Sequence, residues 1–282
     1  MEPEPPSSRP SRDAVAGRPS PLQLEIAERS VTGPVRSHNE DVAFASHDGS
    51  FFGVCDGMGG ARGGEVASAM AADLIRAELA EVPSNACPEA LASLVDHAIG
   101  VAALAIHARA GKEVSLSGMG TTATVAAIAG GELVIGHVGD SRAYLFRGGR
   151  LTQLTRDQTM VELMVERGQM TREEAEASPY RNVILQAVGT QPQVDVELVR
   201  VALREDDVIL VCSDGLAGSL SNDAIERIVE SPASVAELCD VLIDRAIEAE
   251  STDNVTCVVA RVVRSAQGPG MWTSLKTWWG RS

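Results

Sequence analysis

A chain of 282 residues, 44% of them hydrophobic, can bury one substantial core, and single domains of this size are common among β-sandwich and barrel folds. The formal net charge of −15 argues against nucleic-acid binding, which depends on clustered Lys and Arg that this sequence lacks. The longest apolar stretch, at residues 101–106, is far shorter than the roughly 20 residues that cross a membrane, so we expect no transmembrane segment.

The two ends of the chain differ in composition from its middle. Residues 1–20 are rich in Pro and Ser without a periodic apolar pattern, which predicts a disordered tail and not a secretory signal. We expect one folded domain over residues 21–264 and a Trp-rich C-terminal tail over 265–282. The five cysteines are odd in number and not closely paired, so we expect reduced, buried thiols and a cytoplasmic protein.

The first half of the folded domain contains two groups of strands with a pair of helices between them. Apolar and polar residues alternate over 22–28, which predicts a β-strand. Gly148-Gly149 predicts a tight hairpin at the end of the second group. In chain order we expect strands at 42–46 and 51–55, helices at 64–80 and 89–110, and strands at 122–129, 132–138, 142–147 and 150–155.

The second half begins with short helical segments at 157–168 and 171–177, the second opened by a capping box of Thr171 and Glu174. Clustered strands with inserted helices predict an α+β fold, in which two packed antiparallel β-sheets are flanked by helices as an α-β-β-α sandwich. The remaining expected elements are strands at 194–201, 207–212 and 255–263 and helices at 222–230 and 234–249.

Acidic residues stand at the ends of several predicted strands. In FFGVCDGMGG, residues 51–60, an apolar strand ends in Asp-Gly, which is typical of a hairpin turn. No returning strand follows, because glycines lead into a helical stretch instead. VILVCSDGLAG repeats this pattern, and the full set of such acids is Glu40, Asp41, Asp56, Asp140, Asp214 and Asp253.

Each of these acids alone is more often a turn or cap residue than a ligand. If the strand ends meet at one edge of the sandwich, however, the carboxylates repel one another unless a cation neutralises them. Oxygen ligands without His or Cys select Mg²⁺ or Mn²⁺ over zinc. We also expect Gly57, Gly59 and Gly60 to let the backbone approach such an ion.

Six short motifs occur in an order that resembles the bacterial metal-dependent protein phosphatases, the type 2C serine/threonine phosphatases. The resemblance makes 21–264 a phosphatase catalytic domain with a mobile flap at about 157–190. It implies hydrolysis of phosphomonoesters on phosphoserine and phosphothreonine proteins by metal-activated water, without a covalent intermediate. The motifs are Arg36 with NED (39–41), DGMGG (56–60), GTT (120–122), GDSR (139–142), SDG (213–215) and DN (253–254).

The resemblance also implies which residues bind the two core ions, Mn²⁺ or Mg²⁺. Asp56 bridges the pair, and the Gly57 carbonyl binds one ion. Asp214 and Asp253 bind the other.

Further residues take their roles from the same resemblance. Glu40 and Asp41 complete the shell directly or through water, and Asp140 forms a third metal site with Asp214. Arg36 clamps the phosphate oxygens through its planar guanidinium.

One position departs from the pattern of many eukaryotic relatives, which have His after the first Asp-Gly. This sequence has Met58, which cannot donate a proton to the leaving alkoxide. Water bound to the metal and His38 are the two alternatives for the acid.

Two competing hypotheses have weaker support. The stretch from Cys239 to Arg245 has the spacing of a cysteine-dependent phosphatase, but it is helix-like, lacks glycine and carries two aspartates that would repel a phosphate. A catalytically inactive phosphatase-like scaffold or regulatory binding module is the other alternative, although all the expected acids are present.

The resemblance and the C-terminal composition also indicate partners. The resemblance points to phosphoproteins, which can be a Hanks-type kinase and its substrates, anti-sigma-factor antagonists or proteins of a secretion system. All three tryptophans fall in MWTSLKTWWGRS, and the apolar residues of this stretch share one helical side. We expect this tail either to pack or stay disordered, or to dock a partner or a membrane surface.

Overall fold

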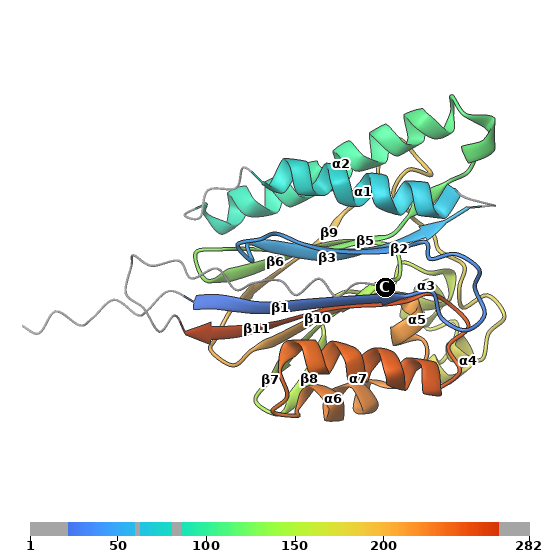
Figure 1. Cartoon of the computed structure of the whole chain (residues 1–282). Helices are drawn as coiled ribbons and strands as arrows, with labels where there is room; N and C mark the ends of the chain where they lie inside the picture. The colour runs from blue at the N-terminus through green and yellow to red at the C-terminus, as the bar shows by residue number, and fades with distance from the viewer. Residues whose placement is uncertain (1–21, 60–62, 81–85, 265–282) are drawn as a thin grey trace, which may run out of the picture.

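The computed structural model describes residues 22–59, 63–80 and 86–264, which form four layers in the order helix, sheet, sheet, helix (Figure 1). Both sheets are antiparallel throughout. The expected α+β sandwich is therefore confirmed. Residues 1–20 and the Trp-rich tail lie outside the described residues.

The first sheet has the strand order β1-β11-β10-β7-β8, and the second has the order β2-β3-β5-β6-β9, with β4 paired to β3. The strands of the first sheet are β1 (Leu22–Val31), β7 (Arg142–Arg147), β8 (Arg150–Gln153), β10 (Val208–Cys212) and β11 (Val255–Arg264). Those of the second are β2 (Asp41–Ala45), β3 (Phe51–Met58), β4 (Gly120–Thr121), β5 (Ala123–Ala129), β6 (Glu132–Val138) and β9 (Glu197–Ala202).

Two long helices, α1 (Gly63–Leu79) and α2 (Pro88–Ala110), cover the second sheet (Figure 1). The buried face of α1 consists largely of small residues, which lets the helix lie close to the strands. By length and composition alone α2 could cross a membrane, but Val95 and Ile99 on its buried face belong to the core formed with α1 and the second sheet. A short 3₁₀ helix at Val114–Leu116 follows α2.

The first sheet is covered by α5 (Asp214–Ala217), α6 (Asn222–Val229) and α7 (Val235–Glu248) (Figure 1). Ser234 and Glu237 form a capping box that begins α7. The stretch from Cys239 to Arg245 lies within this helix, and Cys239 is buried with its thiol donating to the Ala27 carbonyl. Its backbone therefore cannot form a phosphate-binding loop.

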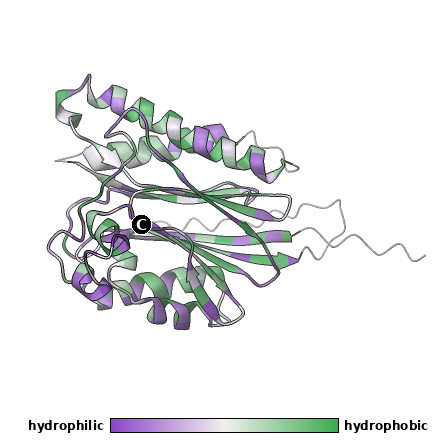
Figure 2. Cartoon of the chain, turned by 180° about the vertical axis from the view of Figure 1, so that it is seen from behind, coloured by the Kyte–Doolittle hydropathy of each residue, from purple (hydrophilic) through white to green (hydrophobic). Residues whose placement is uncertain are grey.

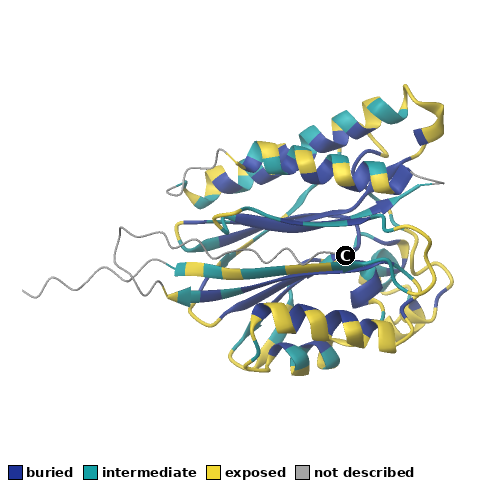
Figure 3. Cartoon of the chain, in the orientation of Figure 1, coloured by how far each residue is buried: buried dark blue, intermediate teal, exposed yellow. Residues whose placement is uncertain are grey.

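A third apolar layer lies between the two sheets and joins them into one body. It includes Phe52 and Ile135 from the second sheet and Ile209 and Val258 from the first, all fully buried. Green, hydrophobic residues are frequent along the strands in Figure 2, and Figure 3 shows long buried stretches in central strands such as β3 and β10. Burial of both faces leaves the strand ends as the natural place for polar chemistry.

Most predicted elements are found within a few residues of their expected bounds. The Gly148-Gly149 hairpin is confirmed, with φ of 60° and 80°, and so is the capping box of Thr171 and Glu174. The predicted strand at 194–201 begins only at Glu197, because the Asp195 backbone bonds both ends of the Gln186 side-chain amide. The prediction of five buried thiols is wrong at Cys87, which is exposed beside the start of α2.

The segment between β8 and β9, residues 154–196, contains only two short helices, α3 (Met160–Glu166) and α4 (Arg172–Glu176). It lies at the same end of the sandwich as α5 (Figure 1). We call it the β8–β9 segment, and it includes the residues expected to form a flap.

Candidate active site

The antiparallel topology brings the predicted acids to one end of both sheets. Asp41 is the first residue of β2 and is paired with Asp56 in β3. Asp140 lies in the turn between β6 and β7, and Asp214 is the first residue of α5, just beyond β10. Asp253 lies two residues before β11, whose first residues pair with the end of β10, so Asp253 and Asp214 lie at the same end of this strand pair. The strand ends that carry these acids therefore meet at one end of the sandwich.

Asp56 is at the centre of this group electrostatically. Its pKa is raised well above the usual range, first by burial and then by the charges of four other carboxylates, which belong to Asp41, Asp214, Asp140 and Asp253. A carboxylate in such surroundings is costly to ionise unless positive charge is added. The arrangement is that of a site built for cations.

The neighbouring acids have the same character. Burial raises the pKa of Asp41 to about 6, although Ser213 Oγ donates to its Oδ2 at 2.7 Å. Burial and then the charges of Asp214 and Asp157 raise the pKa of Asp140 to about 8. The pKa of Asp214 is also raised, by burial and then by Asp253.

Two buried carboxylate oxygens, Asp41 Oδ1 and Asp214 Oδ1, have no hydrogen-bond partner among the described residues. Unpaired buried oxygens are rare, and here they belong to the predicted ligand set, so the donors fit a hard divalent cation. No three His, Cys, Asp or Glu side chains within residues 22–59, 63–80 and 86–264 already form a closed metal-binding cluster. The acids are thus close enough to shift one another's pKa values, but their side chains do not form the arrangement that binds a metal ion.

Arg36 is the basic residue at this acidic end. Its Nη2 lies 2.5 Å from Asp253 Oδ2, and Glu40 and Asp214 also help to raise its pKa against the effect of burial. Its side chain is 47% exposed, so part of the guanidinium fork faces solvent. Arg36 can therefore contact an anionic group that approaches the acids.

Hydroxyl side chains hold the backbone of Asp56 in place, a role that sequence reasoning did not assign to them. Thr121 Oγ1 and the Thr122 N–H both donate to the Asp56 carbonyl, at 2.9 and 2.8 Å. Thr122 Oγ1 accepts from the Asp56 N–H at 3.0 Å and is hydrogen bonded to Ser141 Oγ at 2.8 Å. The signal available in the sequence was the hydroxyl residues within three of the motifs, GTT, GDSR and SDG.

Asn254 holds the loop that carries Arg36. Its Nδ2 donates to the carbonyls of Thr32 and His38, both at 2.9 Å. Its Oδ1 accepts from the Glu40 N–H at 2.8 Å. The DN motif thus combines an acid, Asp253, with an asparagine, Asn254, whose hydrogen bonds hold the loop between β1 and β2 in place.

Close packing requires a glycine at position 57, the first glycine of DGMGG. This reason differs from the one expected from the sequence, which was the approach of the backbone to an ion. A Cβ on Gly57 would clash with the carbonyl oxygens of Gly64 and Glu40, because the start of α1 lies against β3. Gly59 has φ of 113°, a region that favours glycine. Gly60 lies outside the described residues. Met58 is half-buried and His38 is exposed.

A family model described as protein phosphatase 2C matches residues 36–254. The chain belongs to the protein phosphatase 2C family. It is 40% identical over 242 residues to serine/threonine protein phosphatase PstP of Mycobacterium tuberculosis, covering 86% of this chain and 46% of PstP. It is 35% identical to serine/threonine phosphatase stp of Listeria welshimeri, covering 82% of this chain and 93% of that protein. The chain thus spans about half the length of PstP.

Solved structures of serine/threonine phosphatases have the same fold. The Mycobacterium tuberculosis PstP/Ppp structure matches with a TM-score of 0.79 at 38% identity, covering 86% of this chain and 99% of that one. Staphylococcus aureus Stp1 matches with a TM-score of 0.80 at 31% identity, covering 88% and 99%. A PstP catalytic domain in complex with two manganese ions matches with a TM-score of 0.78 at 38% identity, covering 86% and 100%.

Proposed function

We propose that this chain is a metal-dependent serine/threonine phosphoprotein phosphatase that hydrolyses phosphomonoesters without a covalent enzyme intermediate. The observation that carries the proposal is the convergence of four carboxylates on Asp56, in a chain with the motifs of the protein phosphatase 2C family. When bound, two divalent cations lower the pKa of water, so that hydroxide is available near neutral pH for attack on phosphorus.

We assign the core ligands from motif position and electrostatics together. Asp56 bridges two Mn²⁺ or Mg²⁺ ions, with the Gly57 carbonyl on one of them, while Asp214 and Asp253 hold the other. The unpartnered Asp214 Oδ1 supports this assignment.

The remaining acids complete the site. Glu40 and Asp41 add direct or water-mediated contacts to the core, and Asp41 Oδ1 is free to do so. Asp140 and Asp214, whose charges influence each other, hold a third ion.

Arg36 orients the phosphoryl group. The exposed part of its guanidinium donates to phosphate oxygens, while its contact with Asp253 keeps it beside the core acids. The Asn254 clamp holds the backbone of the Arg36 loop in place for this contact.

Hydrolysis of p-nitrophenyl phosphate and of a phosphothreonine peptide tests the proposal. We expect both activities to require added Mn²⁺ or Mg²⁺ and to vanish with EDTA. Cys239→Ser is expected to keep full activity, because this thiol is buried in α7 away from solvent. Activity in EDTA, or loss of activity in Cys239→Ser, would refute the metal mechanism. A scaffold that has lost catalysis would hydrolyse neither substrate.

We propose that the substrates are phosphoserine and phosphothreonine proteins, among them a Hanks-type kinase and its targets. The names of the relatives support a phosphoprotein substrate class. Four buried free thiols, which belong to Cys55, Cys212, Cys239 and Cys257, favour a reducing, cytoplasmic location. Phosphoproteomics of a deletion strain tests the kinase relationship, since sites that accumulate phosphate should match the kinase's own targets.

For the Trp-rich tail, we propose docking to a partner or a membrane surface. Deletion of residues 268–282 should leave turnover of p-nitrophenyl phosphate unchanged and weaken pull-down of a partner or sedimentation with anionic vesicles. Identical behaviour with and without the tail in both binding assays would remove this proposal.

A further inference from the structure

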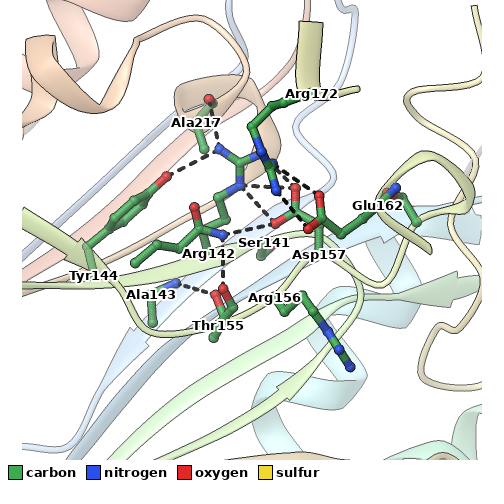
Figure 4. Close-up of polar contacts among 12 residues, drawn as sticks. Ser141, Arg142, Ala143, Tyr144, Thr155, Arg156, Asp157, Glu162, Arg172 and Ala217 are labelled. Carbon is green, nitrogen blue, oxygen red and sulfur yellow. Dashed lines mark hydrogen bonds and ion pairs between the residues drawn. The ribbon is translucent and has the colours of Figure 1, made fainter. Parts of the chain in front are cut away.

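Arg142, the first residue of β7, is the centre of a half-buried polar network (Figure 4). Its Nε donates to Asp157 Oδ1 at 2.8 Å, and its Nη2 donates to Asp157 Oδ2 at 2.6 Å. Its Nη1 lies 3.3 Å from the Tyr144 hydroxyl and 3.4 Å from the carbonyl of Ala217. One guanidinium therefore joins β7, α5 and the beginning of the β8–β9 segment.

Gln158, the residue after Asp157, contacts the turn between β6 and β7 that contains Asp140. Gln158 donates its backbone N–H to the Gly139 carbonyl at 2.7 Å and accepts the Gly139 N–H on its Oε1 at 2.9 Å. In the sequence, Gly139 and Arg142 lie on either side of Asp140 and Ser141. The Asp140 turn is thus held on both sides by two consecutive residues of the β8–β9 segment, Asp157 and Gln158.

A second ion pair, within the β8–β9 segment, joins its two short helices. Arg172 of α4 donates to both carboxylate oxygens of Glu162 in α3, at 3.1 and 3.0 Å. Figure 4 shows this pair beside Arg142 and Asp157. Asp157 itself is not a free ligand, because Arg142 occupies both of its oxygens. It acts as a fixed anchor that lies close enough to raise the pKa of Asp140.

We propose that Asp157 and Gln158 are positioning residues, which hold Asp140 through Arg142 and Gly139 and thereby couple the order of the β8–β9 segment to cation binding at Asp140. This inference rests on the proposed role of Asp140 as a ligand of the outer ion. Coupling is reciprocal: an ion at Asp140 protects the segment, and a loosened segment weakens binding of that ion by the same factor.

The chain offers a matched control at the opposite end of β7. Arg147 makes the same two-pronged contact with Asp207, through Nε to Oδ1 at 2.7 Å and Nη2 to Oδ2 at 2.6 Å. The arginine side chains are similarly exposed, 25% for Arg142 and 28% for Arg147. Loss of either pair should destabilise the fold, but only the Asp157 pair is adjacent to the acidic site.

The experiment compares Asp157→Asn with Asp207→Asn in the full chain. Calorimetry measures Mn²⁺ binding, and limited trypsin digestion measures cleavage after the exposed Arg167 and Arg181 with and without Mn²⁺. For Asp157→Asn we expect the weakest Mn²⁺ event to lose roughly tenfold in affinity, a typical coupling factor. We also expect faster cleavage and little protection by Mn²⁺. Asp207→Asn should match the wild type in Mn²⁺ binding and in Mn²⁺ protection.

Gln158→Ala provides a second test if Asp157→Asn does not fold, because it removes the side-chain contact with the Gly139 N–H, keeps the backbone bond to the Gly139 carbonyl and leaves Arg142 paired. The same metal and protease results are expected from it. Equal behaviour of the Asp157 and Asp207 variants, or unchanged Mn²⁺ binding in Gln158→Ala, would overturn the coupling.

Asp140→Ala separates this failure from a failure of the outer site. If that variant keeps every Mn²⁺ event, the ligand role of Asp140 is wrong. If it loses one while the Asp157 and Gln158 variants do not, only the coupling is wrong.

Discussion

Asp41 and Asp56 lie directly opposite each other on neighbouring antiparallel strands, β2 and β3. Like charges in this position destabilise a sheet, and Asp41 also contributes to the raised pKa of Asp56. The fold therefore keeps an unfavourable pair at the place where a cation would make it favourable. Without a metal ion the fold would be more stable if one of these two residues were uncharged, whereas binding of a cation would require both carboxylates.

Asp56→Asn should abolish phosphatase activity and yet stabilise the protein in EDTA. A carboxyl whose pKa is raised on folding loses stability as the pH rises from 3.8 towards its folded value, by about 1.4 kcal/mol per unit. Asn carries no such cost at pH 7, so the free energy of unfolding should rise by about 1 kcal/mol or more. Thermal unfolding in EDTA checks this, and a lower melting temperature would contradict it.

Asp140→Ala should distinguish an outer site from the core. We expect it to keep the core Mn²⁺ events in calorimetry and to lose more activity on phosphopeptides than on p-nitrophenyl phosphate. A serine alkoxide needs a proton on leaving, whereas p-nitrophenolate is a good leaving group. Equal loss on both substrates would argue against proton supply from this site. An unfolded variant would show that Asp140 is a structural turn residue.

Asn254→Ala should weaken substrate binding through the Arg36 loop. The change removes two donors to the carbonyls of Thr32 and His38 and one acceptor for the Glu40 N–H. We expect a cost of about 1–3 kcal/mol in stability and a higher KM for p-nitrophenyl phosphate. Steady-state kinetics at saturating Mn²⁺ measure this, with inhibition by inorganic phosphate as a second readout. An unchanged KM and phosphate inhibition constant would show that the loop needs no clamp.

His137 should make stability fall in acid. It is fully buried on β6, bonded to Thr124 Oγ1 and to the Arg156 carbonyl, and burial lowers its pKa from 6.5 to about 4. Because the unfolded chain binds a proton that the folded chain does not, stability is complete above pH 6.5. It then falls by about 1.4 kcal/mol per pH unit down to about pH 4.

The control for that prediction is His137→Gln, which cannot take up the proton. Chemical denaturation of both proteins at pH 7 and pH 5 isolates the histidine, because the site carboxylates titrate in both. The difference in free energy of unfolding between the wild type and His137→Gln should fall by about 2 kcal/mol from pH 7 to pH 5. A difference that does not change with pH would mean that His137 is protonated in the fold.

Local patterns predicted the elements and the acids well. The alternation in 22–28 and the apolar runs around Asp56 and Asp214 correspond to β1, β3 and β10. The strand predicted at 194–201 begins later because the backbone of Asp195 bonds to the side chain of Gln186, which lies outside the periodic pattern. Cys87 was assigned to the interior because composition says nothing about which thiols end a loop.

The sequence by itself determined which residues we propose for the chemistry: the strand-end acids, the glycine after Asp56, and an arginine ahead of β2. These follow from short patterns, because strand periodicity and turn chemistry act over a few neighbouring residues. Only the tertiary structure decided which side chains hold those acids. Ser213 reaches Asp41 across 172 positions, and Arg142 reaches Asp157 from another element. Such contacts depend on strand order and register, which bring distant segments together after the chain has folded.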